Sequence, residues 1–421
     1  MRQTALEDLI PGMVTAEEVK DVRGRILIAA GAVLEEKHLR ALKMWGVTTV
    51  SIEGEDEETQ AEEQEERLDP AMMERVRGYA NEMFLQNYEN REFPMFKTLF
   101  ILSVKRLARA KNIAPEYSFP QTFDSPLNGA SDVTHVSGGN HLTAADMVAQ
   151  TKTLASLPSI YEELMKVVNH PHSSATDVAN VIASDPSLTA RLLRIVNSTF
   201  YSFPAKIDTV SRAITIVGTA QLCDLALATS VMSTFGKTLD GIVNMELFWK
   251  HSVAVGVFAR QFAGLRREAN TEGYFVMGLL HDLGRLIVYA QAPELARTTL
   301  DESLRRKTPM YAVEKEIFGF NHADVGMALL EAWNLPHAQR EATGRHHRPD
   351  AATRFPNEAA IIHVADVIAN ALRMGRSGDL YVPPLHPEAW DKIGVDHTLL
   401  PELVKDAETQ VSDLMRIFAQ D

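Results

Sequence analysis

The fold of this chain is decided by the stretch Gly278-Leu279-Leu280-His281-Asp282-Leu283-Gly284-Arg285. Its leucines cover much of the circumference of a helical projection, so the pattern predicts a buried helix. A histidine and an aspartate, His281 and Asp282, stand side by side among these apolar residues. A buried carboxylate is costly unless it is paired, hydrogen-bonded or bound to a metal. Because adjacent helical residues point about 100° apart, the pair can flank one ion or divide between two.

A lone His-Asp pair is more often a satisfied pair in a protein core than a metal site. Further candidate ligands lie on other predicted helices, namely His251, His322, the double histidine His346-His347, and Asp366. Imidazole and carboxylate groups are the usual ligands of first-row transition metals. The sequence therefore predicts a site for one or two divalent ions of iron, manganese, zinc or nickel.

The composition limits the classes of protein to consider. The 421 residues are 45% hydrophobic, enough for two or three globular domains. A formal net charge of −14 argues against a broad nucleic-acid surface and against an anionic membrane surface. One cysteine, Cys223, cannot form an internal disulfide. With no apolar signal segment and no run of about 18 apolar residues, we expect a cytoplasmic protein with no membrane span.

The predicted fold is mainly α, with a small N-terminal α+β module. Six parts are expected: the α+β module at 1–52, an acidic linker at 53–68, a helical connector at 69–112, a flexible linker at 113–141, an all-helical domain at 142–398, and a C-terminal helix at 399–421. The acidic linker has too little apolar surface to order itself, and the second linker is rich in proline, glycine and serine. The terminal helix is amphipathic; it can pack on the domain or serve a homodimer, and the pattern leaves both open.

Within the N-terminal module we expect strands at 13–19, 25–29 and 47–52, with a turn at 21–24 and a helix at 35–45. In the helical domain, Asp185-Pro186 starts a helix by capping and first-turn chemistry. That helix belongs to the phrase Ala183-Ser184-Asp185-Pro186-Ser187-Leu188-Thr189-Ala190-Arg191-Leu192-Leu193-Arg194-Ile195-Val196-Asn197-Ser198.

This phrase resembles the signature of the HDOD family, as do Ile207 to Gly218 and Leu279 to Arg285. The resemblance runs from about residue 150 to 366. It implies an all-α domain related to the HD metal-dependent phosphohydrolases, in a family known mainly as bacterial signalling and regulatory modules. Residues 9–52 resemble, over a shorter stretch, the module that precedes HD-GYP cyclic-di-GMP phosphodiesterase domains.

The resemblance also implies roles for the histidines and aspartates. His251 matches the first HD-type histidine, His281-Asp282 the defining pair, His322 the third histidine, His346-His347 the double histidine of HD-GYP relatives, and Asp366 the closing aspartate. One ion would take His251, His281, Asp282 and Asp366. A second would share Asp282 and take His322 with His346 or His347. Asp282 and Arg285 would be the catalytic residues if the domain is active.

Three departures from the active relatives are visible. Arg348-Pro349-Asp350, and later Phe355-Pro356, stand where HD-GYP domains have Gly-Tyr-Pro after the double histidine. Arg285 replaces a frequent lysine, although its fork can still pair with phosphate. Leu247 occupies a position that is glutamate in some relatives, and the nearest acid is Glu246.

The sequence leaves three hypotheses open. The domain is a non-catalytic interaction module, a metal-dependent phosphohydrolase or phosphodiesterase acting on a nucleotide such as a cyclic dinucleotide, or a sensor that passes a ligand or metal state to a partner. The complete ligand set favours the second and third, and the departures favour the first and third. The expected partner is a signalling protein or a nucleotide ligand, with no direct nucleic-acid or membrane binding.

Overall fold

The structure is a computed structural model of the whole chain. It describes residues 2–5, 9, 11–20, 26–44, 49–52, 70–109, 143–151, 159–168, 170–235 and 242–419. The described chain separates into two compact units, one of residues 1–76 with 107–113 and one of residues 77–106 with 114–421. The expected linkers at 53–68 and 113–141, and the expected turn at 21–24, lie outside the described residues, and the predicted domain boundaries stay predictions.

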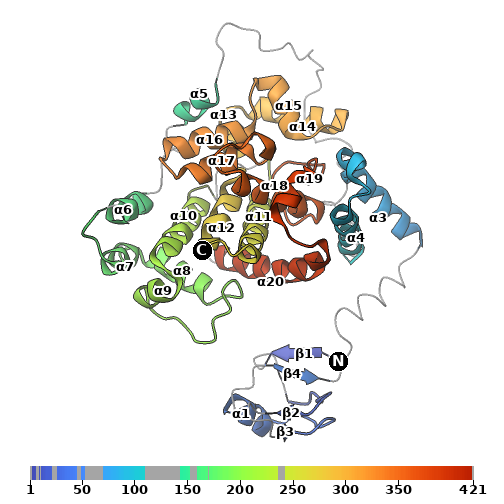
Figure 1. The fold of residues 1–421 in the computed structure, drawn as a ribbon, viewed down its shortest axis with the longest axis vertical. Helices are drawn as coiled ribbons and strands as arrows, with labels where there is room; N and C mark the ends of the chain where they lie inside the picture. The colour runs from blue at the N-terminus through green and yellow to red at the C-terminus, as the bar shows by residue number, and fades with distance from the viewer. Residues whose placement is uncertain are drawn as a thin grey trace. The chain divides into compact units, whose positions relative to one another are not determined.

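The first unit contains two short antiparallel sheets and a helix (Figure 1). Strand β1 (Arg2–Ala5) pairs with β4 (Thr49–Ile52), and β2 (Val19–Lys20) pairs with β3 (Ile26–Ile28). Helix α1 (Glu36–Met44) follows β3. Their apolar side chains form a core of its own, made of Leu9, Val19, Ile28, Leu34, Leu42, Val50 and Ile52.

Two features of this module differ from expectation. Residues 13–18 form no strand, only isolated bridges at Val14 and Thr15, and β2 begins at Val19. The buried Thr15 hydroxyl donates to the Ala29 carbonyl at 2.7 Å and accepts from the Ala32 N–H at 3.0 Å, so it binds a turn instead of extending a ladder. Strand β1 is not expected from the sequence because its polar residues lack a strand pattern; it forms by pairing with β4.

The second unit is helical, which confirms the predicted mainly α fold. Its elements, including two helices that begin or end in the first unit, are α3 (Pro70–Met83), η2 (Leu85–Asn90), α4 (Pro94–Arg109), α5 (Ala144–Gln150), α6 (Ser159–Val168), α7 (Ala175–Ala183), α8 (Pro186–Val196), α9 (Val210–Val217), α10 (Thr219–Phe235), α11 (Met245–Leu265), α12 (Thr271–Leu280), α13 (Leu283–Gln291), α14 (Pro293–Arg306), α15 (Met310–Phe318), α16 (His322–Ala332), α17 (His337–Arg345), η4 (Pro349–Ala351), α18 (Pro356–Ala371), α19 (Pro387–Ile393), η5 (His397–Leu399) and α20 (Leu400–Phe418).

Local chemistry starts several of these helices. Asp185 caps α8 by accepting from the N–H groups of Ser187 and Leu188, as its Asp-Pro sequence predicts. Asn321 and Asp324 form a reciprocal capping box at the start of α16. That box fixes His322 as the first residue of α16, and the N–H of a first-turn residue has no partner within its own helix.

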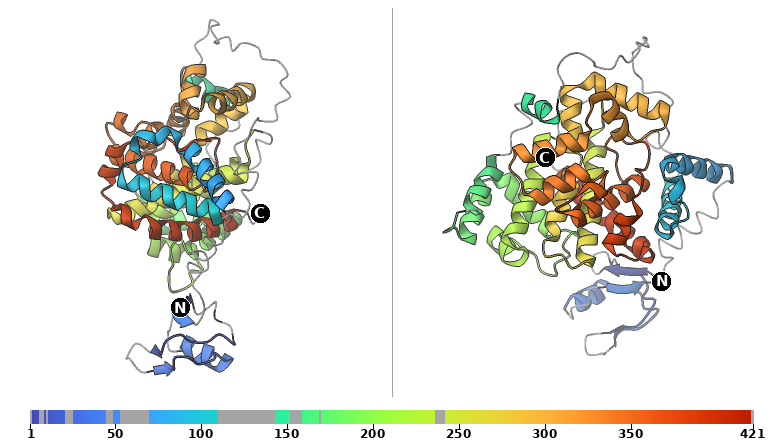
Figure 2. Two further views of the ribbon diagram at one scale, coloured as in Figure 1. Left: turned by 90° about the vertical axis from the view of Figure 1, so that its right-hand side faces the viewer. Right: turned by 45° about the horizontal axis from the view of Figure 1, so that its top comes forward.

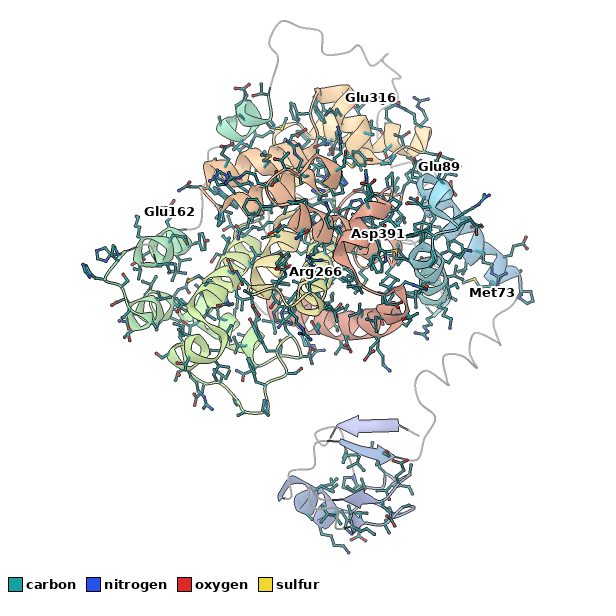
Figure 3. The ribbon with its side chains drawn as sticks, in the orientation of Figure 1. Met73, Glu89, Glu162, Arg266, Glu316 and Asp391 are labelled. Carbon is teal, nitrogen blue, oxygen red and sulfur yellow. The ribbon has the colours of Figure 1, made fainter. Side chains whose placement is uncertain are left out.

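Helix α11 lies at the centre of the second unit and packs against α12, α18 and α20 (Figure 1). Residues 251–259 of this helix are buried on every side, the pattern of a helix enclosed by others. Helix α4 lies beside α20 in both views of Figure 2, and Arg106 pairs there with Glu408. Arg266, labelled in Figure 3, binds the carbonyls of Lys392 and Ile393 at the end of α19.

Among the described residues, no single helix has both the length and the apolar character needed to cross a membrane. The bent pair α9 and α10 meets the length and composition criteria only when its two helices are taken together.

Candidate metal centre

All seven predicted ligands meet in the interior of the second unit. They are His251 on α11, His281 and Asp282 between α12 and α13, His322 at the start of α16, His346 and His347 after α17, and Asp366 on α18. None is more than 4% exposed. Residues from three helices and two connections therefore share one buried polar cluster.

The stretch Gly278–Arg285 is not the single helix that its pattern predicts. Helix α12 ends at Leu280, and α13 begins at Leu283 after Asp282 adopts φ −102° and ψ 8°. Across this break His281 Nε2 lies 3.3 Å from Asp282 Oδ2. The apolar periodicity continues through the break and gives no sign of it.

Glycines let the helices that carry the ligands cross closely. A Cβ on Gly278 of α12 would lie 2.6 Å from the Gly256 Cα of α11, and a Cβ on Gly284 of α13 would lie 1.9 Å from the His322 carbonyl oxygen of α16. Real Cβ atoms essentially never make contacts this short. These two crossings bring His251 and His322 from their separate helices to His281 and Asp282.

Asp282 divides its two oxygens between two groups of histidines. Its Oδ2 lies 3.3 Å from His281 Nε2 and 3.8 Å from His251 Nε2. Its Oδ1 lies 3.1 Å from His322 Nε2 and 3.9 Å from His346 Nε2. A carboxylate with this placement can serve two cation positions, one through each oxygen.

Asp366 completes the first of these groups. Its Oδ1 lies 3.1 Å from His251 Nε2 and 3.6 Å from His281 Nε2, and the Asn370 side chain donates to it at 2.7 Å. His347 joins the second group, with its Nε2 only 3.0 Å from that of His322. Three sets of three close ligand atoms result. Two are separate, namely His251, His281 and Asp366, and His322, His346 and His347, and the third, His281, Asp282 and His346, links them.

The unpartnered ring nitrogens test whether these residues fit a metal. Among the described residues, His281 Nε2, His346 Nε2 and both ring nitrogens of His251 are buried without a hydrogen-bond partner. Carboxylate oxygens lie near two of these atoms, but not in the direction of a hydrogen bond. The Nδ1 atoms of His281 and His346 each lie 2.6 Å from a backbone carbonyl, so in the neutral rings they donate and leave the lone pair on Nε2. A cation would satisfy these lone pairs, and the donor set fits a divalent transition metal.

The electrostatics set the protonation states of these ligands. Burial opposes ionisation of Asp282, but Arg285 and His281 beside it hold its pKa well below the ordinary value. Burial, reinforced by the charges of His281 and His322, lowers the pKa of His346 to about 3. Burial disfavours a charged His281, yet the Asp282 carboxylate raises its pKa to about 10. Asp282 and His346 are therefore already in the forms that coordinate cations, and His281 releases its proton when an ion binds.

Three further residues, outside the predicted ligand set, contact the ligands or Arg285. The Glu314 Oε2 accepts from the His322 backbone N–H at 2.8 Å and lies 2.6 Å from its Nδ1. Asp379 forms a buried ion pair with Arg285. His363, one helical turn before Asp366, lies with its Nδ1 2.7 Å from the His346 carbonyl oxygen. A signal for Glu314 exists in the sequence, because it shares a buried helical face with Met310 and Val313.

The departures noted in the sequence have structural counterparts. Glu246 is exposed on the first turn of α11, away from the buried cluster. The Leu247 carbonyl accepts a hydrogen bond from the Arg376 N–H at 2.8 Å. Arg285 is fully buried, and its Nε donates to Asp282 Oδ1 at 3.1 Å.

Residues 154–349 match the model of the HDOD domain family. The chain carries an HDOD domain. Asp366, which lies beyond the matched range, joins the other ligands through α18.

Solved structures share the fold of this HDOD domain. An HDOD domain protein of unknown function from Geobacter sulfurreducens is 24% identical, with a TM-score of 0.55 over 66% of this chain and 98% of its own. A candidate phosphohydrolase from Shewanella amazonensis is 24% identical, with a TM-score of 0.53 over 66% of this chain and 100% of its own. A candidate signal transduction protein from Marinobacter aquaeolei is 18% identical, with a TM-score of 0.52 over 69% of this chain and 68% of its own.

An uncharacterised protein from Treponema pallidum is 25% identical over 205 residues, which make up 48% of this chain and 39% of that protein. The match thus spans well under half of this relative.

Proposed function

We propose that this chain is a bacterial signalling protein whose HDOD domain holds a divalent transition metal and acts through ligand or partner binding. One observation carries the proposal: seven buried histidines and aspartates lie together in the core. Several of the histidine ring nitrogens lack a hydrogen-bond partner among the described residues. A buried polar cluster stabilises a protein only when its polar atoms are satisfied, and a metal satisfies these nitrogens at once.

The two groups around Asp282 suggest how the ligands are shared. His251, His281, Asp366 and the Oδ2 of Asp282 would hold one ion. His322, the Oδ1 of Asp282, and His346 or His347 would hold a second. Imidazole and carboxylate donors suit iron, manganese, zinc and nickel, and the proposal extends to any of them.

A metal-dependent phosphohydrolase acting on a nucleotide, such as a cyclic dinucleotide, is the second candidate. Two features favour it. The two oxygens of Asp282 face different groups of histidines, and the buried guanidinium of Arg285 lies next to this carboxylate. Bound there, two ions would supply the charge that holds a phosphate and activates a water. In this candidate Asp282 supplies oxygen ligands, and Arg285 orients Asp282 through its Nε and adds positive charge beside the site.

We also propose the cytoplasm as the compartment and a signalling protein or nucleotide as the partner. The buried, unpaired thiol of Cys223 suits a reducing compartment. A net charge of −14 disfavours direct binding to nucleic acid.

Elemental analysis by mass spectrometry of the purified protein tests the metal centre. We expect one or two equivalents of iron, manganese, zinc or nickel, and their loss in the His281→Ala/Asp282→Ala double variant. His337→Ala, which removes an exposed histidine from α17, is the matched control and should keep the metal. A well-folded wild-type protein that binds no metal even after reconstitution would sink the assignment.

Hydrolysis of a generic aryl phosphodiester separates the two candidates. The phosphohydrolase candidate predicts activity that needs added Mn²⁺ or Fe²⁺ and disappears in His281→Ala. Metal binding without any such activity would leave the signalling module as the function, and activity that survives in the variant would belong to a contaminant.

A further inference from the structure

The segment between α18 and α19, residues 373–386, is buried although it is irregular. The structure describes all of these residues, and they form neither helix nor strand. Ser377 and Val382 are 0% exposed and Met374 is 1% exposed. Irregular segments usually run over the surface, because their backbone polar groups need partners. Here those partners come from other elements, and we call residues 373–386 the covering segment.

The first part of the covering segment lies against the backbone of α11 at a predicted ligand. A Cβ on Gly375 would lie 2.2 Å from the backbone nitrogen of His251, and Gly375 has φ +84°. This position therefore admits only glycine without strain. The next residue, Arg376, donates its N–H to the Leu247 carbonyl at 2.8 Å. The segment therefore packs directly on the turn of α11 that leads to the predicted ligand His251.

The middle of the covering segment reaches the guanidinium of Arg285. The Asp379 carboxylate pairs with Arg285 Nη2, and the Tyr289 hydroxyl donates to the Ser377 carbonyl at 2.9 Å. Asp379 is 2% exposed and Arg285 0%. A carboxylate of this chain thus occupies N–H groups that an anionic ligand of the centre would use.

The far side of the covering segment is held by residues 77–106, which we call the connector helices. Asn87, 1% exposed, donates to the carbonyls of Val382 and Pro383 at 3.0 Å each and accepts from the Leu385 N–H at 2.7 Å. One side chain therefore satisfies three buried backbone groups of the segment.

Two further bonds strengthen this hold. Asn90 donates to the Leu385 carbonyl at 2.8 Å, and the Met83 carbonyl accepts from the Val382 N–H at 2.8 Å. The covering segment belongs to no helix or sheet that would pair its backbone groups. These bonds from the connector helices supply partners in their place.

We propose that the connector helices gate the metal centre by holding the covering segment closed. The ligands are almost fully buried, so a metal or an anion reaches them only if an element moves. Releasing the covering segment breaks its hydrogen bonds to the connector helices and to α11 and the Asp379–Arg285 ion pair, but it leaves the surrounding helices intact. Its release would uncover the backbone of α11 at His251 and free Arg285 from Asp379. The inference rests on the proposed metal centre, and the two are tested separately.

The test uses the full-length, metal-loaded protein and the Asn87→Ala variant. Two measurements are made: hydrogen–deuterium exchange of peptides that span residues 373–386, and the rate of metal loss to an excess of chelator. We expect both rates to rise about tenfold, since the variant loses several buried hydrogen bonds. Ser103→Ala is the matched control, because Ser103 also lies on the connector helices but donates to Ala371, outside the segment. It should leave both rates near those of the wild type.

Each outcome decides a separate point. If exchange in residues 373–386 is as slow in Asn87→Ala as in Ser103→Ala, the connector helices do not hold the segment. If exchange accelerates but metal loss does not, the segment does not gate the centre, and the gating proposal is overturned while the metal centre stands. A protein that binds no metal contradicts the proposed function instead. The exchange rates then still show whether the connector helices hold the covering segment. If Asn87→Ala does not fold, Asn90→Ala removes the single bond to Leu385 and should give a smaller rise in both rates.

Discussion

Glu314 orients His322 in the proposed second metal position. Its Oε2 accepts from both the backbone N–H and the Nδ1 of His322, and the other ring nitrogen, Nε2, lies 3.1 Å from Asp282 Oδ1. A carboxylate behind a ligating histidine fixes its tautomer and raises its basicity. Glu314 is 1% exposed, so water does not replace it.

We expect Glu314→Gln to weaken metal binding roughly 10- to 100-fold, the usual effect of removing such a partner. The substitution keeps the volume but removes the charge that supports His322. Competition titration against a coloured chelator measures the affinity. Glu316→Gln is the control, because Glu316 lies exposed on the same helix (Figure 3). Equal affinities for the two variants would show that Glu314 does not support the metal.

At the scale of helices, the glycine crossings determine whether the ligands meet. Gly284 of α13 packs directly on α16, where an added Cβ would lie 1.9 Å from the His322 carbonyl oxygen and 2.6 Å from the Gly326 nitrogen. Both neighbours are backbone atoms, so no side-chain rotation relieves the contact. The two helices would have to separate, and His322 would move away from Asp282.

Gly284→Ala should therefore destabilise the protein by at least about 1–3 kcal/mol, as overpacking does, and should lower its metal content. Gly264→Ala on α11 is the same change in open space, where no atom lies within 4 Å of the added Cβ. Because alanine is the better helix former by about 1 kcal/mol, this control should be neutral or stabilising. Thermal unfolding of the two variants measures the difference. A Gly284→Ala protein as stable as wild type would contradict the close crossing.

The elements also show how far sequence reasoning reaches. The capped helix after Asp185 was predictable, because its signals are local. The break at Asp282 was not, because leucines on both sides keep a helical period and tertiary contacts impose the break. The convergence of the ligands followed from residue types and the family resemblance, whereas Asp379 sits in an irregular segment where no periodicity marks burial.

At the scale of the whole molecule, the two units have separate sources of stability. The core of the N-terminal module comes from residues 9–52, and none of the predicted ligands lies there. The ligands instead join α11, α12, α13, α16, α17 and α18 within the second unit, between residues 251 and 366. A metal that binds only the folded state adds its binding free energy to the stability of that unit.

Removing the metal should therefore act on one unit only. At a free metal concentration 100 to 1,000 times the Kd, binding stabilises by about 3–4 kcal/mol. That corresponds to a Tm shift of roughly 6–16 °C for a large domain. Differential scanning calorimetry of the intact chain, with and without a chelator, measures it. We expect the transition of the helical unit to fall by this amount, while the transition of the N-terminal module in the same scan stays in place. If the chelator leaves the Tm of the helical unit unchanged in a metal-loaded sample, the metal lies outside the folded core. That outcome would contradict a metal bound by these buried ligands.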